Sequence, residues 1–388
     1  MSDTQFKSAT EFINHIAEPE ERPVDLVWLK DKTETFCQDN ALKLGIIQSL
    51  EILKSKGEKG LSKGAIPKIL QDALSITFDT RVGHDYFDDA ENYFDNYQQS
   101  VRRIPFDIKQ MNLITKGGWK PKTLNIYMAS SGAGKSLVMC HSAASDLQMG
   151  FNVLYVTAEL SEDMVRERID SNLLNIDMGV VKKMSKQEYL RRISEVRAKT
   201  TGRLKIQEYG PATASAATVR HLLNELKTKK DFKPDIIYID YLNIFLPFSL
   251  GKSDNTYTSV KRVAEEFRAL AKEFDVPVVS ATQTNRAGYG ISPEMENVSD
   301  SLGLVMTADM LIAIRQDDDQ EQRGVYEYKQ LKSRYADKGH LTRFLVGVDK
   351  NKMRLFTIDE DTQPAGPPTP TLVVDNTAPS PGNFKGFS

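Results

Sequence analysis

The sequence predicts an α/β fold with a mostly parallel twisted sheet flanked by helices. Short β-like runs alternate with helical runs from about residue 121 to 360, which is typical of parallel strands joined by helical crossovers. A loop of small residues that ends in Gly-Lys-Ser separates the first β run from a helical run. The continuous apolar run 236–239, followed by an acid, is typical of a strand buried on both faces.

The chain is expected to divide into four segments. Residues 1–58 form a helical N-terminal segment, because apolar residues recur there at helical spacing until a Gly-rich break. Residues 59–120 hold a short helix and a lead-in, and residues 121–360 hold the α/β region. Residues 361–388 are rich in Pro, Gly, Thr and Ser, which predicts a disordered tail.

The short helix of the second segment is expected to begin near Pro67, where the missing N–H of proline costs nothing. Ile66, Leu70, Ala73 and Leu74 recur at helical spacing and form one apolar face. Such a face needs a partner surface.

The α/β region is expected to contain nine β runs, the last of them antiparallel. They are 124–128, 153–156, 204–207, 236–239, 278–281, 310–314, 326–331, 344–348 and 355–358.

Composition and charge exclude several protein classes. The 388 residues are 40% hydrophobic and 27% charged, as in a soluble globular protein, and no apolar run approaches the roughly 20 residues of a membrane span. Cys37 and Cys140 lie far apart, which predicts a reduced cytosolic setting without a disulfide or zinc framework. The net charge of −2 excludes a uniformly basic nucleic-acid coat, so nucleic-acid binding would need local basic clusters or a ring of basic loops.

The loop 129–136 is expected to bind the phosphates of a nucleotide. Backbone N–H groups in such a loop, and at the N-terminus of the helix after it, bind anionic oxygens. Lys135 would reach the β- and γ-phosphates, and the Ser136 hydroxyl would ligate Mg²⁺. Ala129 replaces the usual first glycine at the strand exit, where a small side chain suffices. The cradle itself consists of Ser131, Gly132, Ala133, Gly134, Lys135 and Ser136.

Three polar residues end or follow strands of the predicted sheet. Asp240 follows a buried apolar run, so it is expected in the ligand crevice, where it can hold Mg²⁺. Glu159 can polarise the water that attacks the γ-phosphate, although a helix N-terminal charge is the plainer interpretation. Gln283 can sense the γ-phosphate through its neutral amide.

These residues together resemble the RecA-fold ring helicases of the DnaB class, and most of all the replicative helicases of T-even-type phages. The resemblance covers roughly residues 25–360, and its most specific phrase is 332–338, Lys-Ser-Arg-Tyr-Ala-Asp-Lys. Further phrases that carry it are 82–85, 114–118, 221–227 and 239–242.

The resemblance implies a RecA-like P-loop NTPase core and an ATP-dependent replicative DNA helicase that assembles as a hexameric ring. It implies ATP or another NTP with Mg²⁺ as cofactors, and Glu159 as the catalytic base. It implies that Arg334 is a finger reaching the nucleotide of the neighbouring subunit, with Lys332 as its companion. The apolar helix face at 66–74 would dock on the adjacent subunit. The helical segment before it is short for the collar domain of this class, which puts collar contacts in doubt.

The resemblance also places single-stranded DNA in the ring channel, with primase, a helicase loader and single-strand-binding protein as further partners and no membrane. It implies a phage-encoded protein that acts in the host cytoplasm. Two polar loops after strands are expected to hold the DNA backbone without reading sequence. Their candidate contacts are Lys252, Arg286, Tyr289 and Gly290.

Two alternatives remain open from the sequence. A RecA-like recombinase or repair ATPase shares the core but forms filaments on DNA. A degenerate scaffold would bind partners without hydrolysis, although intact Lys135, Ser136, Glu159 and Asp240 argue against it.

Overall fold

The computed structural model describes residues 26–54, 65–74, 76–77, 86–87, 89–91, 94–95, 102–130, 132–248, 256–283, 302–334, 341–359 and 363. The chain divides into two compact units, residues 1–100 and 101–388, and each is described by itself.

Two helices form the described core of the first unit, α2 (Leu26–Lys54) and α3 (Ile66–Leu74). They pack closely at Gly45, because a Cβ there would lie 3.4 Å from Ala73 and 3.6 Å from Leu70. The apolar face predicted on α3 is therefore partly covered within the chain, which corrects the expectation that the whole face awaits another subunit. Leu74 stays 68% exposed.

The opposite side of α2 carries apolar side chains that neither α2 nor the other described residues of this unit bury. Helical spacing aligns them along one stripe away from Gly45. The exposed side chains of this α2 stripe are Leu29, Phe36, Leu44, Ile47 and Leu50.

The second unit contains a nine-stranded sheet, which confirms the predicted fold class. Its order is β3-β2-β4-β5-β1-β6-β7-β8-β9, parallel from β3 to β6 and antiparallel from β6 to β9. The strands are β1 (Leu124–Ala129), β2 (Val153–Thr157), β3 (Leu204–Glu208), β4 (Ile236–Asp240), β5 (Val278–Gln283), β6 (Met310–Arg315), β7 (Val325–Ser333), β8 (Arg343–Asp349) and β9 (Arg354–Thr357).

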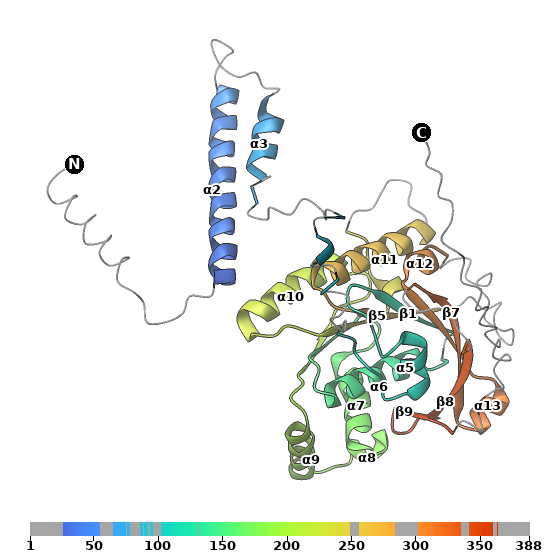
Figure 1. The fold of residues 1–388 in the computed structure, drawn as a ribbon. Helices are drawn as coiled ribbons and strands as arrows, with labels where there is room; N and C mark the ends of the chain where they lie inside the picture. Colours follow the sequence, from blue (N-terminus) through green and yellow to red (C-terminus); the bar gives the residue numbers. More distant parts are fainter. Residues whose placement is uncertain are drawn as a thin grey trace, which may run out of the picture. The chain divides into compact units, whose positions relative to one another are not determined.

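Helices cover both faces of this sheet (Figure 1). Apolar side chains of α5, α6 and α7 pack on one face, and those of α10, α11 and α12 pack on the other. The helices of this unit are α5 (Lys109–Thr115), α6 (Lys135–Gln148), α7 (Glu162–Leu174), α8 (Met178–Val181), α9 (Lys186–Lys199), α10 (Ala216–Lys230), the 3₁₀ helix η2 (Leu242–Ile244), α11 (Thr256–Glu273), α12 (Leu302–Thr307) and α13 (Asp318–Gln322).

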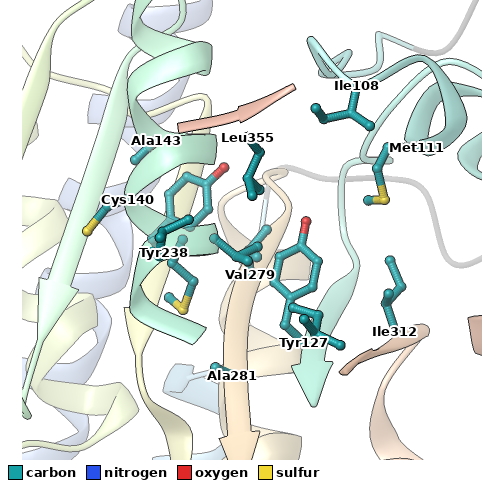
Figure 2. Close-up of a cluster of buried hydrophobic side chains, with 14 of the residues drawn as sticks. Ile108, Met111, Tyr127, Cys140, Ala143, Tyr238, Val279, Ala281, Ile312 and Leu355 are labelled. Carbon is teal, nitrogen blue, oxygen red and sulfur yellow. The ribbon is translucent and has the colours of Figure 1, made fainter. Parts of the chain in front are cut away.

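Strand β4 shows how the sequence builds two cores at once. Ile236 and Tyr238 face the α6 side, whereas Ile237 and Ile239 face the α11 side, because successive side chains of a strand alternate. Figure 2 shows part of the core on the α6 side, in which Ala143 of α6 and Tyr238 of β4 both lie. A strand buried on both faces must be apolar throughout, which explains the continuous run in the sequence.

Within the described residues, no helix is long and apolar enough to cross a membrane. Both cysteines are free thiols. Of the stretch 361–388, the structure describes Gln363, whose side-chain amide exchanges two hydrogen bonds with the backbone of Leu345.

Candidate nucleotide site

The carboxyl ends of four adjacent parallel strands bring the predicted site residues together. In the strand register, Thr157 of β2 pairs with Asp240 of β4, and Ala129 of β1 pairs with Gln283 of β5. A pocket of about 330 Å³ lies at this edge. Its lining consists of Gly132, Gly134, Lys135, Ser136, Leu137, Glu159, Leu160, Arg168, Gln283, Tyr326, Lys350 and Met353.

The loop after β1 requires glycine at two positions. Gly132 and Gly134 have φ values of 76° and 90°, which disfavour other residues. A Cβ at Gly134 would also overlap the Tyr326 hydroxyl. Gly134 caps α6 without a side-chain bond, so the N-terminus of that 14-residue helix presents backbone N–H groups to the pocket side. Ser131 lies outside the described residues.

Lys135 is one of the basic residues that line this pocket, and it is itself mostly buried. Its Nζ donates a hydrogen bond to the Ser130 carbonyl at 3.2 Å. Burial lowers the Lys135 pKa, while the negative charges of Glu159 and Asp240 act to raise it. A phosphate would supply the counter-charge that favours the ammonium form.

Asp240 is fully buried at the end of β4. Its Oδ2 accepts a hydrogen bond from the Tyr155 hydroxyl at 2.8 Å, whereas its Oδ1 is buried and has no hydrogen-bond partner among the described residues. Burial raises the Asp240 pKa to about 6, and the hydrogen bond from Tyr155 opposes this rise. An orphaned buried carboxylate oxygen is costly unless a ligand satisfies it.

The residues present fit a Mg²⁺ ion bound together with a nucleotide. Mg²⁺ at such sites uses one or two protein oxygens and completes its shell with phosphates and water. Asp240 offers the orphaned Oδ1, and Ser136 offers a half-buried hydroxyl in the first turn of α6. No group of three or more His, Cys, Asp or Glu side chains in the described part of the chain could hold a metal without the nucleotide.

Glu159 follows β2 and Gln283 ends β5, and both line this pocket from the two sides of β4. Glu159 is exposed, two residues after β2, and Ser161 rather than Glu159 caps α7. A capping role therefore does not account for Glu159. Gln283 is half-buried at the last position of β5.

Six lining residues were missed by the sequence reasoning, two of which, Leu137 and Leu160, directly follow predicted site residues. Arg168 comes from α7, Tyr326 from β7, and Lys350 and Met353 from the turn between β8 and β9. No motif signals them. The places of Tyr326, Lys350 and Met353 depend on how the antiparallel strands extend the sheet, and that of Arg168 depends on how α7 packs.

Lys332 and Arg334 lie at the opposite ends of the strands, where the parallel strands β1 and β6 begin. The Arg334 backbone N–H donates to Asp309, and Asp309 in turn pairs with Leu124 at the start of β1. The Arg334 guanidinium donates to the Met306 carbonyl at 2.8 Å and lies 3.4 Å from Asp309 Oδ1. Lys332 Nζ donates to the same Met306 carbonyl at 2.8 Å.

The predicted DNA contacts Lys252, Arg286, Tyr289 and Gly290 lie outside the described residues. The structure does describe the strands that precede their loops, β4 and β5, which end at the edge of the sheet that carries the pocket.

Comparison with known proteins gives the family. The sequence model of the DnaB-like helicase C-terminal domain matches residues 104–350. A DnaB-like replicative helicase of enterobacteria phage T4 is 37% identical over 375 residues, covering 94% of this chain and 78% of the relative. The replicative DNA helicase DnaB of Mycoplasma genitalium is 22% identical over 53% of this chain and 45% of its own length.

Solved structures share the fold. A DnaB-like replicative helicase, studied together with its interactions with primase, superposes with a TM-score of 0.61 at 15% identity, covering 85% of this chain and 78% of that one. A separately solved ATPase domain superposes with a TM-score of 0.60 at 16% identity, covering 71% of this chain and all of that domain.

The family model spans both the loop after β1 and the acid that ends β4, and the phage relative extends the likeness along nearly the whole chain. These matches exclude the recombinase and scaffold alternatives. The chain therefore belongs to the DnaB-like replicative helicases, which are ATP-dependent DNA helicases.

Proposed function

We propose that this helicase assembles as a homohexameric ring around single-stranded DNA and hydrolyses ATP, or another NTP, at the interfaces between subunits. Hydrolysis would drive translocation and unwinding of duplex DNA at the replication fork. The observation that carries this proposal is the separation of the Lys332–Arg334 end of β7 from the phosphate loop of the same chain.

The separation follows from the strand register. Arg334 bonds to Asp309, which bonds to Leu124 at the start of β1, whereas the phosphate loop leaves the other end of β1 after Ala129. Five steps along a strand span roughly 17 Å. An arginine side chain does not cover that distance, which supports a role for Arg334 at a nucleotide held by another subunit and not at that of its own chain.

The pocket residues are assigned distinct tasks. The backbone N–H groups of residues 131–136 and the Lys135 ammonium bind the phosphates. Glu159 accepts a proton from the attacking water, which its exposed position permits. Gln283 contacts the γ-phosphate. Arg334 and Lys332 of the neighbouring subunit stabilise the charge that develops on the transferred group.

Asp240 and Ser136 would hold Mg²⁺, which would neutralise part of the phosphate charge. Asp240 suits this task because its Oδ1 is buried and without a hydrogen-bond partner.

Further binding partners are proposed from the family to which the chain belongs and from its exposed apolar side chains. Lys252, Arg286, Tyr289 and Gly290 are proposed to contact single-stranded DNA in the channel. The α2 stripe and exposed Leu74 are proposed to contact other copies of the chain, because large apolar side chains in one stripe favour association. Primase, a loader and single-strand-binding protein are proposed as partners in the host cytoplasm, since the related solved helicase was studied with primase.

The deciding experiment mixes two inactive variants. Lys135→Ala subunits keep an intact finger but have a disabled pocket, and Arg334→Ala subunits have the reverse lesion. Mixed rings place some intact pockets beside intact fingers, so DNA-stimulated phosphate release should recover in part. A finger that serves its own chain allows no recovery at any mixing ratio.

Exchange of subunits is checked by mass spectrometry of the mixed rings, which separates a failure to mix from a failure to complement. Mixed rings without recovered hydrolysis would contradict the proposal. Electron microscopy with single-stranded DNA and a slowly hydrolysed ATP analogue tests the ring itself.

A further inference from the structure

A buried tyrosine from β2 stands directly against the acid that ends β4. We propose that Tyr155 is a positioning residue for the metal site, because it fixes one oxygen of Asp240 and leaves the other for Mg²⁺. This inference rests on the proposed role of Asp240 and adds a residue to that site which no sequence motif marks.

The contact has only one possible hydrogen-bond direction when Asp240 carries its charge. The phenol hydroxyl of Tyr155 donates to Oδ2 of Asp240 at 2.8 Å, since a carboxylate can only accept. Neither residue is exposed. The hydroxyl itself accepts from the Cys140 thiol at 3.7 Å, so a line of three buried groups runs from α6 through β2 to β4.

The packing around Tyr155 holds the phenol in place. Its ring stacks on Tyr238 with centroids 5.9 Å apart and an interplanar angle of 18°. Backbone pairing between β2 and β4 sets the same two residues opposite each other. The Tyr155 hydroxyl therefore has little freedom to leave Asp240, and the carboxylate cannot turn without breaking a buried hydrogen bond.

The two carboxylate oxygens consequently differ. Oδ2 accepts the Tyr155 hydrogen bond, whereas Oδ1 is buried without a hydrogen-bond partner in the part of the chain that the structure describes. A metal ligand whose second oxygen is fixed by an outer partner is already oriented before the ion arrives. Loss of such outer partners lowers metal affinity by about 10- to 100-fold in other proteins.

The experiment replaces Tyr155 by phenylalanine in the full chain and titrates free Mg²⁺. Binding of a fluorescent ADP analogue is followed at each Mg²⁺ concentration, and direct Mn²⁺ binding is followed by electron paramagnetic resonance. Tyr155→Phe should need about 10-fold more Mg²⁺ for half-maximal nucleotide binding. Nucleotide affinity without metal should stay unchanged.

Tyr238→Phe is the matched control. It removes one buried phenol hydroxyl from the adjacent strand, and that hydroxyl also donates to a buried carboxylate, Asp146 at 2.6 Å. Asp146 belongs to α6 and is not part of the metal site. Tyr238→Phe should therefore keep the wild-type Mg²⁺ dependence, even where it lowers the unfolding temperature as much as Tyr155→Phe does.

Two results would overturn the inference: an unchanged Mg²⁺ dependence in Tyr155→Phe, or an equal shift in both variants. Asp240→Asn separates this failure from failure of the metal site. If Asp240→Asn loses the Mg²⁺ effect and Tyr155→Phe keeps it, only the positioning role is wrong. If Asp240→Asn behaves as wild type, the assignment of Asp240 is wrong as well.

Discussion

Lys135 and Glu159 lie on the same pocket but differ in what their replacement should disturb. Lys135→Ala removes a mostly buried ammonium that bonds to the loop itself. We expect it to abolish ATP hydrolysis and to weaken nucleotide binding while the fold persists. Glu159→Gln removes an exposed carboxylate, so binding should stay and turnover should fall at least about 100-fold. Phosphate-release assays and nucleotide titrations measure both, and normal turnover in Glu159→Gln would contradict its role as base.

Asp146 predicts how stability depends on pH. Burial raises its pKa to about 8, although the Tyr238 hydrogen bond opposes the rise. Because the folded state then binds a proton more tightly than the unfolded state, this residue lowers stability as pH rises from about 4 to 8. Asp146→Asn should become more stable relative to wild type by up to about 2 kcal/mol between pH 6 and 8. Urea unfolding at these pH values measures it, and a constant difference would contradict the buried acid.

At the scale of elements, helix α3 carries one side chain that packs on α2 within the chain and another that is proposed to contact a second copy. Leu70 packs near Gly45, so Leu70→Asp should disrupt the pair itself. Leu74 is exposed, so Leu74→Asp should leave the pair folded and weaken assembly between chains. Sedimentation measures the hexamer fraction, and circular dichroism reports the helices. Gln71→Asp, on an exposed position of the same helix, should change neither. Intact hexamers in Leu74→Asp would contradict the proposed contact.

The strands and helices themselves could be predicted from local sequence patterns, but which strands lie side by side in the sheet could not. The nine β runs and the turn to antiparallel strands are confirmed. A strand such as β4, which is buried on both faces, is recognisable by its continuous apolar run. The strand order joins β1 to β5 and β6, which lie far away in the sequence, and no local pattern encodes it.

The same reasoning explains which site residues were missed. The phosphate loop is contiguous, so its residues could be named from spacing alone. Tyr155 contacts Asp240, which lies 85 residues later in the sequence, and Tyr326 lies against Gly134, which is nearly 200 residues earlier. As isolated letters, both tyrosines look like ordinary core residues. The partial cover of α3 by α2 was missed because a glycine gives no apolar signal for the contact that it permits.

At the scale of the whole molecule, the net charge of −2 restricts DNA binding to local contacts. If Lys252 and Arg286 bind phosphates, each alanine variant should lower the slope of log affinity against log salt by about 0.7 for single-stranded DNA. Fluorescence anisotropy between about 50 and 300 mM salt, with an ATP analogue bound, measures the slope. Nucleotide affinity without DNA should stay unchanged, and wild-type slopes in both variants would contradict the contacts.

The distance between Arg334 and the phosphate loop of its own chain has a genetic consequence. In the proposed ring, each copy would complete the site of one neighbour and depend on the other neighbour for its own, so a chain that lacks both Lys135 and Arg334 would disable two sites. Activity should then fall more steeply than the dose of the defective copy. Such an allele would be dominant in a cell that also carries the intact copy, whereas a lesion that merely unfolds the chain would stay recessive.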